Sequence, residues 1–431
     1  MSSKFVIAAA ASGSGKTTLT LGLLRCLRNR GMSVAPFKCG PDYIDPMWHK
    51  VASGVDSVNL DTYLGPKEHV KCLFVRFGAN KNVSVAEGVM GMFDGYSRMS
   101  GSSADIARIL DVPVVLLVNA ASTAYSVAAT VYGFKNFCKD IKLAGVIFNR
   151  VASERHYSFL KDACADVGVR CLGYLKKIPE MEMPSRYLGL SIESQQSMER
   201  FIDMAARTVE DGVDLNALLE ATQVQESVCV LETRKVGMPK LNVAIARDDA
   251  FNFIYPANIL ALTEHPRYDV SVKYFSPLND NALPQCDMLY LPGGYPELYA
   301  ERLAFNKSMR EAVKKYAENG GRIFAECGGM MYLTRSVDGC DMCGVLPMDA
   351  TMHPSKLTLG YRSMEIDGDV WHGHEFHYSH LENPDALPSI ARQTNVKGEV
   401  VGTPLYRYKN VIAGYTHLYW GDKDILKLWQ I

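Results

Sequence analysis

The chain has 431 residues, more than a single hydrophobic core usually holds, so we expect two or three domains. Its composition, 48% hydrophobic and 22% charged, is typical of globular proteins, and its net charge of −1 excludes a general attraction to nucleic acid or membranes. No apolar run reaches the ~20 residues of a membrane span, and a signal peptide is not expected because an apolar strand is predicted at the N-terminus. The eleven cysteines, an odd and scattered set, indicate free thiols, so we expect a cytoplasmic protein.

The first predicted feature is a phosphate-binding loop between a strand at residues 4–9 and a helix at residues 19–28. The intervening Ser-Gly-Ser-Gly-Lys-Thr-Thr lets backbone N–H groups converge on phosphate oxygens at a helix N-terminus. Ala10 replaces the first glycine of the usual motif, and a chance glycine loop is the alternative, which the flanking strand and helix disfavour. Lys16 is predicted to reach the β- and γ-phosphates and the Thr17 hydroxyl to bind Mg²⁺. The predicted nucleotide-binding residues are Ser12, Gly13, Ser14, Gly15, Lys16, Thr17 and Thr18.

Acidic residues follow the ends of the next predicted strands. Asp42 and Asp45 lie three apart between prolines, and Glu87 ends an apolar strand before a glycine-rich segment that contains Asp94. Open α/β sheets bind ligands beyond the carboxyl ends of their strands, and carboxylates there suit Mg²⁺. The alternatives are a capped turn for Asp42 and Asp45 and an ordinary turn for Asp94.

Strands and helices alternate through the rest of the first half, which predicts a doubly wound parallel sheet. Asn149, directly after one strand, could read a purine edge or cap the next element. Strands are predicted within residues 31–38, 82–89, 113–119, 143–148 and 169–175, and helices at 101–110, 125–136, 156–167 and 198–219, with a loop at 179–196.

A stretch of mixed charge without periodicity, residues 223–240, is interpreted as the junction between two domains. We therefore expect domains over residues 1–225 and 241–431, joined by a linker at 226–240. A second α/β series then begins. Strands are predicted at residues 241–246, 270–275, 288–291 and 322–325, and a helix at 253–263.

A cysteine on a sharp turn marks a second candidate site. Cys327 follows a strand and precedes two glycines and a helix, the pattern of a nucleophile elbow. This pattern predicts an exposed thiol at a helix N-terminus, with its pKa lowered; a buried core thiol is the alternative, which the glycines disfavour. His417, late in the chain, is the candidate base. Backbone N–H groups of Gly293, Gly294 and Gly328 are candidates for an oxyanion hole.

Four histidines between residues 371 and 380 raise the question of a metal site. Their spacing matches no standard zinc pattern, and strand alternation would divide them between two faces, so a polar substrate-facing strand is favoured. Cys340 and Cys343 have no second ligand pair nearby, so a hairpin turn is the better interpretation of that segment.

Five motifs occur in this order along the chain: the phosphate loop, Gly-Pro-Asp-Tyr-Ile-Asp-Pro, Glu-Gly-Val-Met-Gly-Met-Phe-Asp-Gly, Leu-Pro-Gly-Gly-Tyr-Pro-Glu and Ala-Glu-Cys-Gly-Gly. Together they resemble the motifs of the cobyrinate a,c-diamide synthase family of cobalamin biosynthesis. The resemblance covers nearly the whole chain. It implies a P-loop domain like that of dethiobiotin synthetase, followed by an α/β class I glutamine amidotransferase domain. The implied activity is a carbon–nitrogen ligase that uses ATP, Mg²⁺ and L-glutamine to amidate the a and c acetate groups of cobyrinate through acyl phosphates.

The resemblance also implies roles for single residues. Asp42 and Glu87, with Thr17, match metal positions, and Asp45 and Asp94 match catalytic ones. Cys327 matches the glutaminase nucleophile and His417 its base. Triad amidotransferases usually carry a glutamate two residues after the histidine, where this chain has Tyr419, so the orienting acid is missing or comes from elsewhere, with Glu297 as a candidate. This gap implies a glutaminase that is slow unless the synthetase half is occupied.

Related reactions remain as alternatives, namely the same a,c-diamidation of nickel-sirohydrochlorin or hydrogenobyrinate. A non-catalytic P-loop regulatory protein with a glutaminase-like domain is the alternative from another class, which the intact Cys327 and His417 disfavour. The expected partners are small molecules only, without nucleic acid or membrane. The resemblance to P-loop enzymes, which often dimerise, makes a homodimer a candidate assembly, on which the residues themselves give no information.

Overall fold

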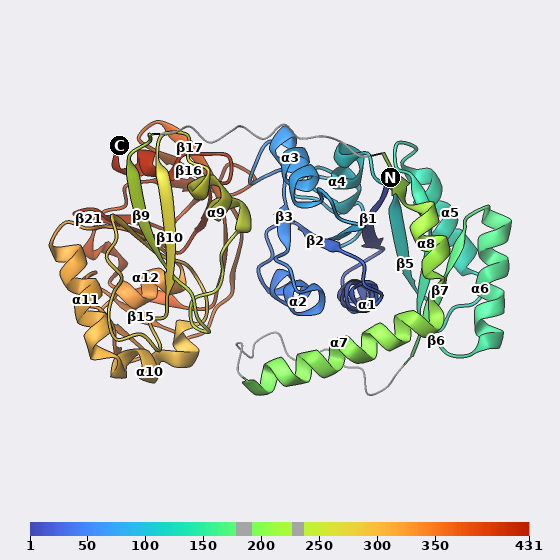
Figure 1. Ribbon diagram of the computed structural model, residues 1–431, viewed down its shortest axis with the longest axis horizontal. Coiled ribbons are helices and arrows are strands. Elements are labelled where there is room, and N and C mark those ends of the chain that lie inside the picture. Colours follow the sequence, from blue (N-terminus) through green and yellow to red (C-terminus); the bar gives the residue numbers. More distant parts are fainter. Residues whose placement is uncertain (178–191, 226–236, 431) are drawn as a thin grey trace. The chain divides into compact units, whose positions relative to one another are not determined.

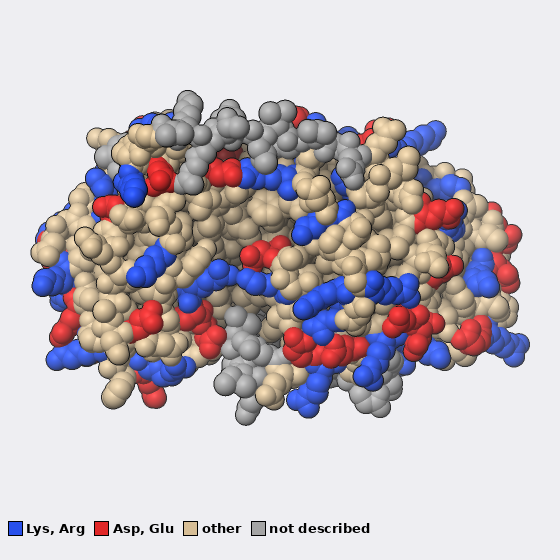
Figure 2. All heavy atoms as spheres, viewed as in Figure 1, with Lys and Arg blue, Asp and Glu red and all other residues tan. Residues whose placement is uncertain are grey.

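The computed structural model describes residues 1–177, 192–225 and 237–430, which form two compact units (Figure 1). One unit contains the first two ranges and the other the third. Most of the predicted loop and most of the predicted linker lie outside the described residues. Within these three ranges, no helix has both the length and the apolar character that a membrane crossing requires. On the face in Figure 2, basic and acidic side chains are interspersed, as the near-zero net charge suggests.

A parallel sheet forms the centre of the first unit, and it confirms the predicted doubly wound architecture. The strand order is β3-β2-β4-β1-β5-β6-β7, with the short β8 antiparallel to the start of β1. The fully buried strand β1 occupies the middle of the sheet, where the chain turns from one half of the order to the other. The strands are β1 (Ser2–Ala9), β2 (Val34–Cys39), β3 (Val58–Leu60), β4 (Val83–Glu87), β5 (Val114–Asn119), β6 (Leu143–Val151), β7 (Cys171–Lys176) and β8 (Gln223–Val224).

Helices connect these strands, and α1 packs against both α2 and α7. The structure corrects the predicted helix at 198–219, which is two helices separated near Asp214, whose side chain caps the second by accepting from the Ala217 N–H. The helix α7 already begins at Ile192, so residues 192–196 are not the predicted loop. The helices are α1 (Lys16–Asn29), α2 (Ile44–Ser53), α3 (Lys67–Phe77), α4 (Ser103–Leu110), α5 (Val127–Phe137), α6 (Glu154–Val167), α7 (Ile192–Gly212) and α8 (Leu215–Ala221).

The second unit is built on a sheet of order β10-β9-β11-β12-β22-β21, parallel except for the edge strand β21. One apolar cluster packs between this sheet and its helices, and a second packs on the opposite face. The elements are β9 (Lys240–Ala246), α9 (Pro256–Thr263), β10 (Asp269–Phe275), β11 (Met288–Leu291), η1 (Pro296–Tyr299), α10 (Ala300–Phe305), α11 (Lys307–Glu318), β12 (Arg322–Glu326), α12 (Gly328–Leu333), β21 (Leu405–Tyr408), β22 (Val411–Gly414) and η3 (Ile425–Trp429).

Two smaller sheets complete this unit. One has the order β14-β13-β15-β18 and the other β20-β19-β16-β17-β23. The five-stranded sheet contributes Met364 and Trp371 to the second apolar cluster, where they join Tyr290 and Phe324 of the main sheet. The strands are β13 (Ser336–Val337), β14 (Cys340–Asp341), β15 (Asp349–Thr351), β16 (Thr358–Ile366), β17 (Asp369–His377), β18 (His380–Glu382), β19 (Arg392–Thr394), β20 (Val400–Val401) and β23 (His417–Tyr419).

Candidate active sites

The predicted phosphate loop connects the buried strand β1 to the N-terminus of α1. Gly13 and Gly15 have φ angles of 74° and 99°, a region that side chains disfavour. A Cβ at position 15 would also lie 2.2 Å from Asn149 Nδ2. The Asn149 amide donates a 2.8 Å hydrogen bond to the carbonyl oxygen of Ser14. The structure therefore assigns Asn149 to bracing the loop, a role that neither sequence-based alternative anticipated.

Lys16 and Thr17 begin α1 directly behind this loop. The Lys16 ammonium donates to the carbonyl oxygens of Met90 at 2.5 Å and Ala11 at 3.3 Å, so it lies along the loop. Burial is the main reason that its pKa is lowered, and the nearby charge of Lys38 adds to this effect. The Thr17 hydroxyl donates a 2.7 Å hydrogen bond to Glu87 Oε1, which joins the loop to the end of β4.

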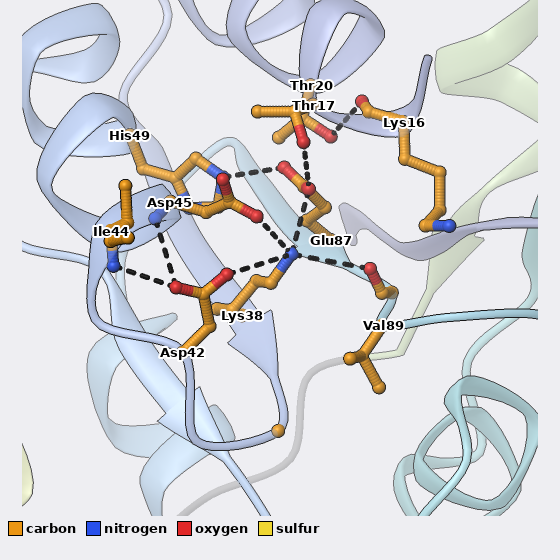
Figure 3. A network of polar contacts seen from close by, with 12 residues as sticks. Lys16, Thr17, Thr20, Lys38, Asp42, Ile44, Asp45, His49, Glu87 and Val89 are labelled. Atoms are coloured by element: carbon orange, nitrogen blue, oxygen red, sulfur yellow. Dashed lines mark hydrogen bonds and ion pairs between the residues drawn. The ribbon is translucent and has the colours of Figure 1, made fainter. Parts of the chain in front are cut away.

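A buried lysine lies among three of the four predicted acidic residues, and Asp94 is not one of its partners (Figure 3). Lys38, on β2, places its ammonium 2.5 Å from Asp45 and 2.9 Å from Glu87, with Asp42 at 4.0 Å. Burial alone lowers the pKa of Lys38, but the charges of Asp45 and Glu87 outweigh burial and leave the pKa raised. The pKa of Glu87 lies well below its usual range. Burial by itself would raise this pKa, but the charge of Lys38 and, next in size, the hydrogen bond from His49 lower it by more.

The second oxygen of Glu87 contacts a buried histidine on α2. His49 Nε2 lies 2.8 Å from Glu87 Oε2, and His49 Nδ1 lies 2.9 Å from the Ser57 hydroxyl. Neither Lys38 nor His49 was predicted as a site residue from the sequence. One signal was present, since His49 lies four residues after Asp45 and therefore on the same face of a helix.

The structure also supplies ordinary structural contacts for two of the candidates. Asp42 Oδ1 accepts from the backbone N–H groups of Ile44 at 2.8 Å and Asp45 at 3.4 Å, which is the capped turn that opens α2. Asp94 Oδ2 accepts from the Gly91 N–H at 3.0 Å. Each residue keeps a second carboxylate oxygen, so a turn contact and a functional role are compatible.

The residues at this site fit a magnesium ion bound together with phosphates. Three carboxylates lie around the buried Lys38 ammonium, with Lys16 as a second cation nearby, and carboxylate oxygens are ligands that suit Mg²⁺. Among the described residues no group of three or more His, Cys, Asp or Glu forms a metal cage. Mg²⁺ does not need one, because it usually binds one or two carboxylates plus substrate phosphates and retains several waters.

In the second unit, Cys327 occupies the predicted elbow between β12 and α12. Its φ and ψ angles of 47° and −108° lie outside the regions that non-glycine residues favour, which costs about 1–3 kcal/mol. The Cys327 N–H donates to the carbonyl oxygen of Gly414 at 2.8 Å. A Cβ at position 329 would lie 2.0 Å from the carbonyl oxygen of Leu291, so the helix packs closely only because this residue is glycine.

The expectation of an exposed thiol with a lowered pKa is wrong for this structure. Cys327 is only 4% exposed. Burial raises the pKa of its thiol, and the negative charge of Glu297 raises it further, while the Gly328 N–H opposes both effects. The helix N-terminus is present, but desolvation outweighs its effect. The thiol therefore depends on a base for its activation.

The candidate base, His417, is fully buried at the start of β23. Burial lowers the pKa of its imidazole to about 3, with His374 and His377 adding to the effect, so the ring is neutral at pH 7. A Cβ at position 293 would lie 2.1 Å from the His417 Cε1 atom, which places the ring directly over Gly293.

The turn at Gly293 and Gly294 connects the two candidate catalytic residues. His417 covers Gly293, and a Cβ at position 328 would lie 3.1 Å from the backbone nitrogen of Gly294. The structure thus gathers the elbow, the predicted oxyanion glycines and the histidine around one turn. Glu297, half-buried just beyond this turn, exerts its charge on Cys327, and burial raises its own pKa to about 7.

The histidine-rich segment forms β17, the turn after it and the start of β18. His374 is the register partner of His417 across the pair β17 and β23. The His377 ring stacks on Tyr415, with 3.8 Å between the ring centroids. Cys340 lies in β14, which forms a hairpin with β13.

Two protein-family models match the chain. One describes the CobQ/CobB/MinD/ParA nucleotide binding domain and matches residues 5–190, and the other describes the CobB/CobQ-like glutamine amidotransferase domain and matches residues 242–425. These matches confirm the predicted order of a nucleotide-binding domain followed by an amidotransferase domain.

Similar proteins cover nearly the full length of the chain. A hydrogenobyrinate a,c-diamide synthase from Brucella abortus is 41% identical, over 96% of this chain and 98% of that protein. Cobyrinate a,c-diamide synthases from Picrophilus torridus and Caldanaerobacter subterraneus are 36% and 37% identical, over 96% of this chain and 94% of each relative. Among solved structures, chloroplast FtsY from Physcomitrella patens matches 48% of this chain and 65% of its own, at a TM-score of 0.32 and 14% identity.

Proposed function

The chain belongs to the family of cobyrinate and hydrogenobyrinate a,c-diamide synthases, and we propose that it amidates the a and c acetate groups of a corrin ring with ammonia taken from glutamine. The observation that carries the proposal is that one chain builds two centres. A phosphate loop is bonded to an acidic cluster through Thr17 and Glu87, and a strained cysteine shares a glycine turn with a buried histidine.

In the first centre, a ring carboxylate would attack the γ-phosphorus of ATP to give an acyl phosphate and ADP. A free carboxylate is a poor acyl donor, and this step supplies the leaving group. Lys16 and the loop N–H groups would stabilise the charge that develops on the transferred phosphoryl group. Thr17, Asp42 and Glu87 would hold Mg²⁺, which when bound neutralises phosphate charge. Asp45 and Asp94 are the proposed catalytic residues beside it.

In the second centre, His417 would take the proton of the Cys327 thiol while the sulfur attacks the amide carbon of glutamine. N–H groups of Gly294 and Gly328, together with the turn at Gly293, would stabilise the resulting oxyanion. Collapse of that intermediate, with the proton passed from His417 to the departing nitrogen, releases ammonia and leaves a thioester, which water hydrolyses to glutamate while the free thiol is restored. The ammonia then attacks the acyl phosphate, which gives the amide and inorganic phosphate.

The pKa values of the two catalytic groups in the protein without substrate support a slow glutaminase. The Cys327 pKa is raised and the His417 pKa is lowered, so proton transfer from the thiol to the imidazole is uphill. We infer that glutamine turnover accelerates when the synthetase centre is occupied. Steady ATP hydrolysis without an amide acceptor would instead favour the non-catalytic regulatory alternative.

Cobyrinate and hydrogenobyrinate differ in the central cobalt and share the two acetate groups. Relatives named for each ring resemble this chain, at 41% identity for hydrogenobyrinate and at 36–37% for cobyrinate. We propose that the substrate is one of these two rings: the sequence motifs favour cobyrinate, and the higher identity to the Brucella abortus relative is the reason to test hydrogenobyrinate beside it. Product masses from parallel reactions with both rings and with nickel-sirohydrochlorin would decide between them.

The decisive variant is Cys327→Ser. With ATP, Mg²⁺ and the ring, it should form no amide from glutamine, yet it should form the diamide from added ammonium chloride at the wild-type rate. Loss of both activities would contradict a scheme with two separable centres. Cys138→Ser, at a half-buried thiol of the first unit, is the matched control and should retain both activities.

We also propose a cytoplasmic location and a homodimer. The ten cysteines of the described ranges are all free, which suits a reducing compartment. Light scattering of the purified protein at several concentrations would test the dimer.

A further inference from the structure

A buried glutamate links the strand of the nucleophile to the strand of the base. Glu326 is the last residue of β12, directly before Cys327, and is 2% exposed. Its Oε1 atom accepts a 2.7 Å hydrogen bond from the backbone N–H of Leu418, the residue after His417. Its Oε2 atom accepts a 2.6 Å hydrogen bond from the Tyr290 hydroxyl. No step of the proposed mechanism uses this carboxyl group.

The path of the chain explains why such a link is needed. The strand β22 pairs with β12 as far as Gly414, opposite Glu326. The chain then leaves that sheet, and His417 begins β23, which pairs with β17 in the five-stranded sheet. Nucleophile and base therefore belong to different sheets, and contacts that cross between the sheets must set their separation.

A carboxyl group is a costly choice for a mere packing position. Burial raises the pKa of Glu326 to about 8, against the effect of the Tyr290 and Leu418 hydrogen bonds. The two partners are neutral donors, and they come from two different strands, β11 and β23. The side chain is thus held at both oxygens, which fixes the position of the bond to Leu418.

We propose that Glu326 is a positioning residue of the glutaminase centre, which holds His417 at its working distance from Cys327 through the backbone of Leu418. Position 419, where triad amidotransferases usually carry the glutamate that orients the histidine ring, is a tyrosine in this chain. Glu326 compensates for that glutamate in part, because it fixes the backbone next to His417, although it does not contact the ring. This inference rests on the proposed glutaminase function of Cys327 and His417.

The test compares Glu326→Ala with Glu326→Gln, since a glutamine carbonyl still accepts from Leu418 and its amide still donates to the Tyr290 oxygen. For Glu326→Ala we expect kcat for glutamine-dependent amidation to fall about 100-fold, the cost of a misplacement near 1 Å, with KM for glutamine changed less than about threefold. Glu326→Gln should recover kcat to within about fivefold of the wild type. Ammonium-dependent amidation should be unchanged in both variants.

A second readout separates positioning from general packing. Burial raises the pKa of the Cys327 thiol, so its alkylation at pH 7 by a diazoketone analogue of glutamine depends on His417 as the base. Glu326→Met fills the space of the glutamate but cannot accept the hydrogen bond of the Leu418 N–H, so its alkylation should slow about as much as that of Glu326→Ala. A packing role alone predicts alkylation of Glu326→Met at the wild-type rate.

If Glu326→Ala does not fold, Glu326→Asp takes its place, because it keeps the carboxyl group but withdraws the oxygens by one methylene; kcat should then fall at least tenfold. The inference is overturned if Glu326→Ala, or Glu326→Asp in its place, matches the wild type with glutamine. It is also overturned if Glu326→Gln is as impaired as Glu326→Ala while ammonium use stays intact, or if Glu326→Met is alkylated at the wild-type rate. Failure of the wild type itself to use glutamine would reject the proposed function instead.

Discussion

Lys38 and Glu87 are register partners on the adjacent parallel strands β2 and β4, and their side chains form a buried ion pair of 2.9 Å at the carboxyl end of the sheet. The same oxygen, Glu87 Oε1, accepts the hydrogen bond of the Thr17 hydroxyl. One carboxylate oxygen is therefore shared between a fixed ammonium and the phosphate loop. A divalent cation that binds beside Thr17 must compete with Lys38 for it, which makes Lys38 central to both stability and metal affinity.

The first prediction concerns the stability of this cluster. Lys38→Met leaves Asp45 and Glu87 buried without their shared cation, so we expect a loss of about 3–5 kcal/mol in the free energy of unfolding, measured by urea titration. Lys50→Met is the matched control, because Lys50 pairs with Asp56 on the surface. The control should change the free energy of unfolding by no more than about 1 kcal/mol. Equal losses in both variants would refute the central role of Lys38.

The second prediction separates the two centres. Glu87→Gln weakens the acidic cluster without changing its shape, so the Mg²⁺ concentration needed for half-maximal ammonium-dependent amidation should rise about 10- to 100-fold. Asp45→Asn should act in the same direction. Glutamine should still acylate Cys327, which acid quenching with labelled glutamine would measure. A variant that loses the thioester as well would show that the centres are not separable.

The third prediction concerns pH and His417. Its folded pKa of about 3 lies below the unfolded value of about 6.5, so below pH 6.5 the unfolded chain binds one more proton and stability falls as pH falls. Between pH 7 and pH 5 this single group should remove about 2 kcal/mol of unfolding free energy. His417→Asn abolishes the contribution, so urea titrations of variant and wild type should differ in their pH dependence by that amount. Identical pH dependence would mean that the pKa of His417 in the folded protein equals its unfolded value and is not lowered by burial.

The parts of the first unit that could be predicted from sequence are those with a local signal. Glycines at fixed spacing behind an apolar strand identified the phosphate loop, and the continuous Val and Leu run of β5 is typical of a strand buried on both faces. The helix α2 was not predicted, because the segment around Pro46, with two aspartates between prolines, has the composition of a loop. Proline is tolerated there because the N–H groups of a first helical turn have no partner within the helix.

The rest of the candidate sites depends on contacts between segments that are distant in sequence. Lys38 and His49 belong to no motif, and only the pairing of β2 with β4 and the packing of α2 bring them to Glu87. The elbow at Cys327 was readable from its glycines, but its burial was not, because the groups that act on the thiol, such as Glu297 and Glu375, come from other elements. A local pattern thus predicts backbone geometry more securely than solvent exposure.

The fourth prediction tests the glycine turn that both catalytic residues share. Gly293→Ala places a methyl group 2.1 Å from His417 Cε1 and 3.0 Å from its Nδ1, so the imidazole must leave its position. Since a 1 Å displacement of a catalytic group costs about 100-fold in rate, glutamine-dependent amidation should fall by at least that factor. Ammonium-dependent amidation should persist, because the first centre lies in the other unit. Gly402→Ala is the matched control within the same unit, since a Cβ there meets no atom within 4 Å, and it should retain both activities. If Gly293→Ala kept full glutamine use, His417 could not be working as the base from the position that the structure gives it.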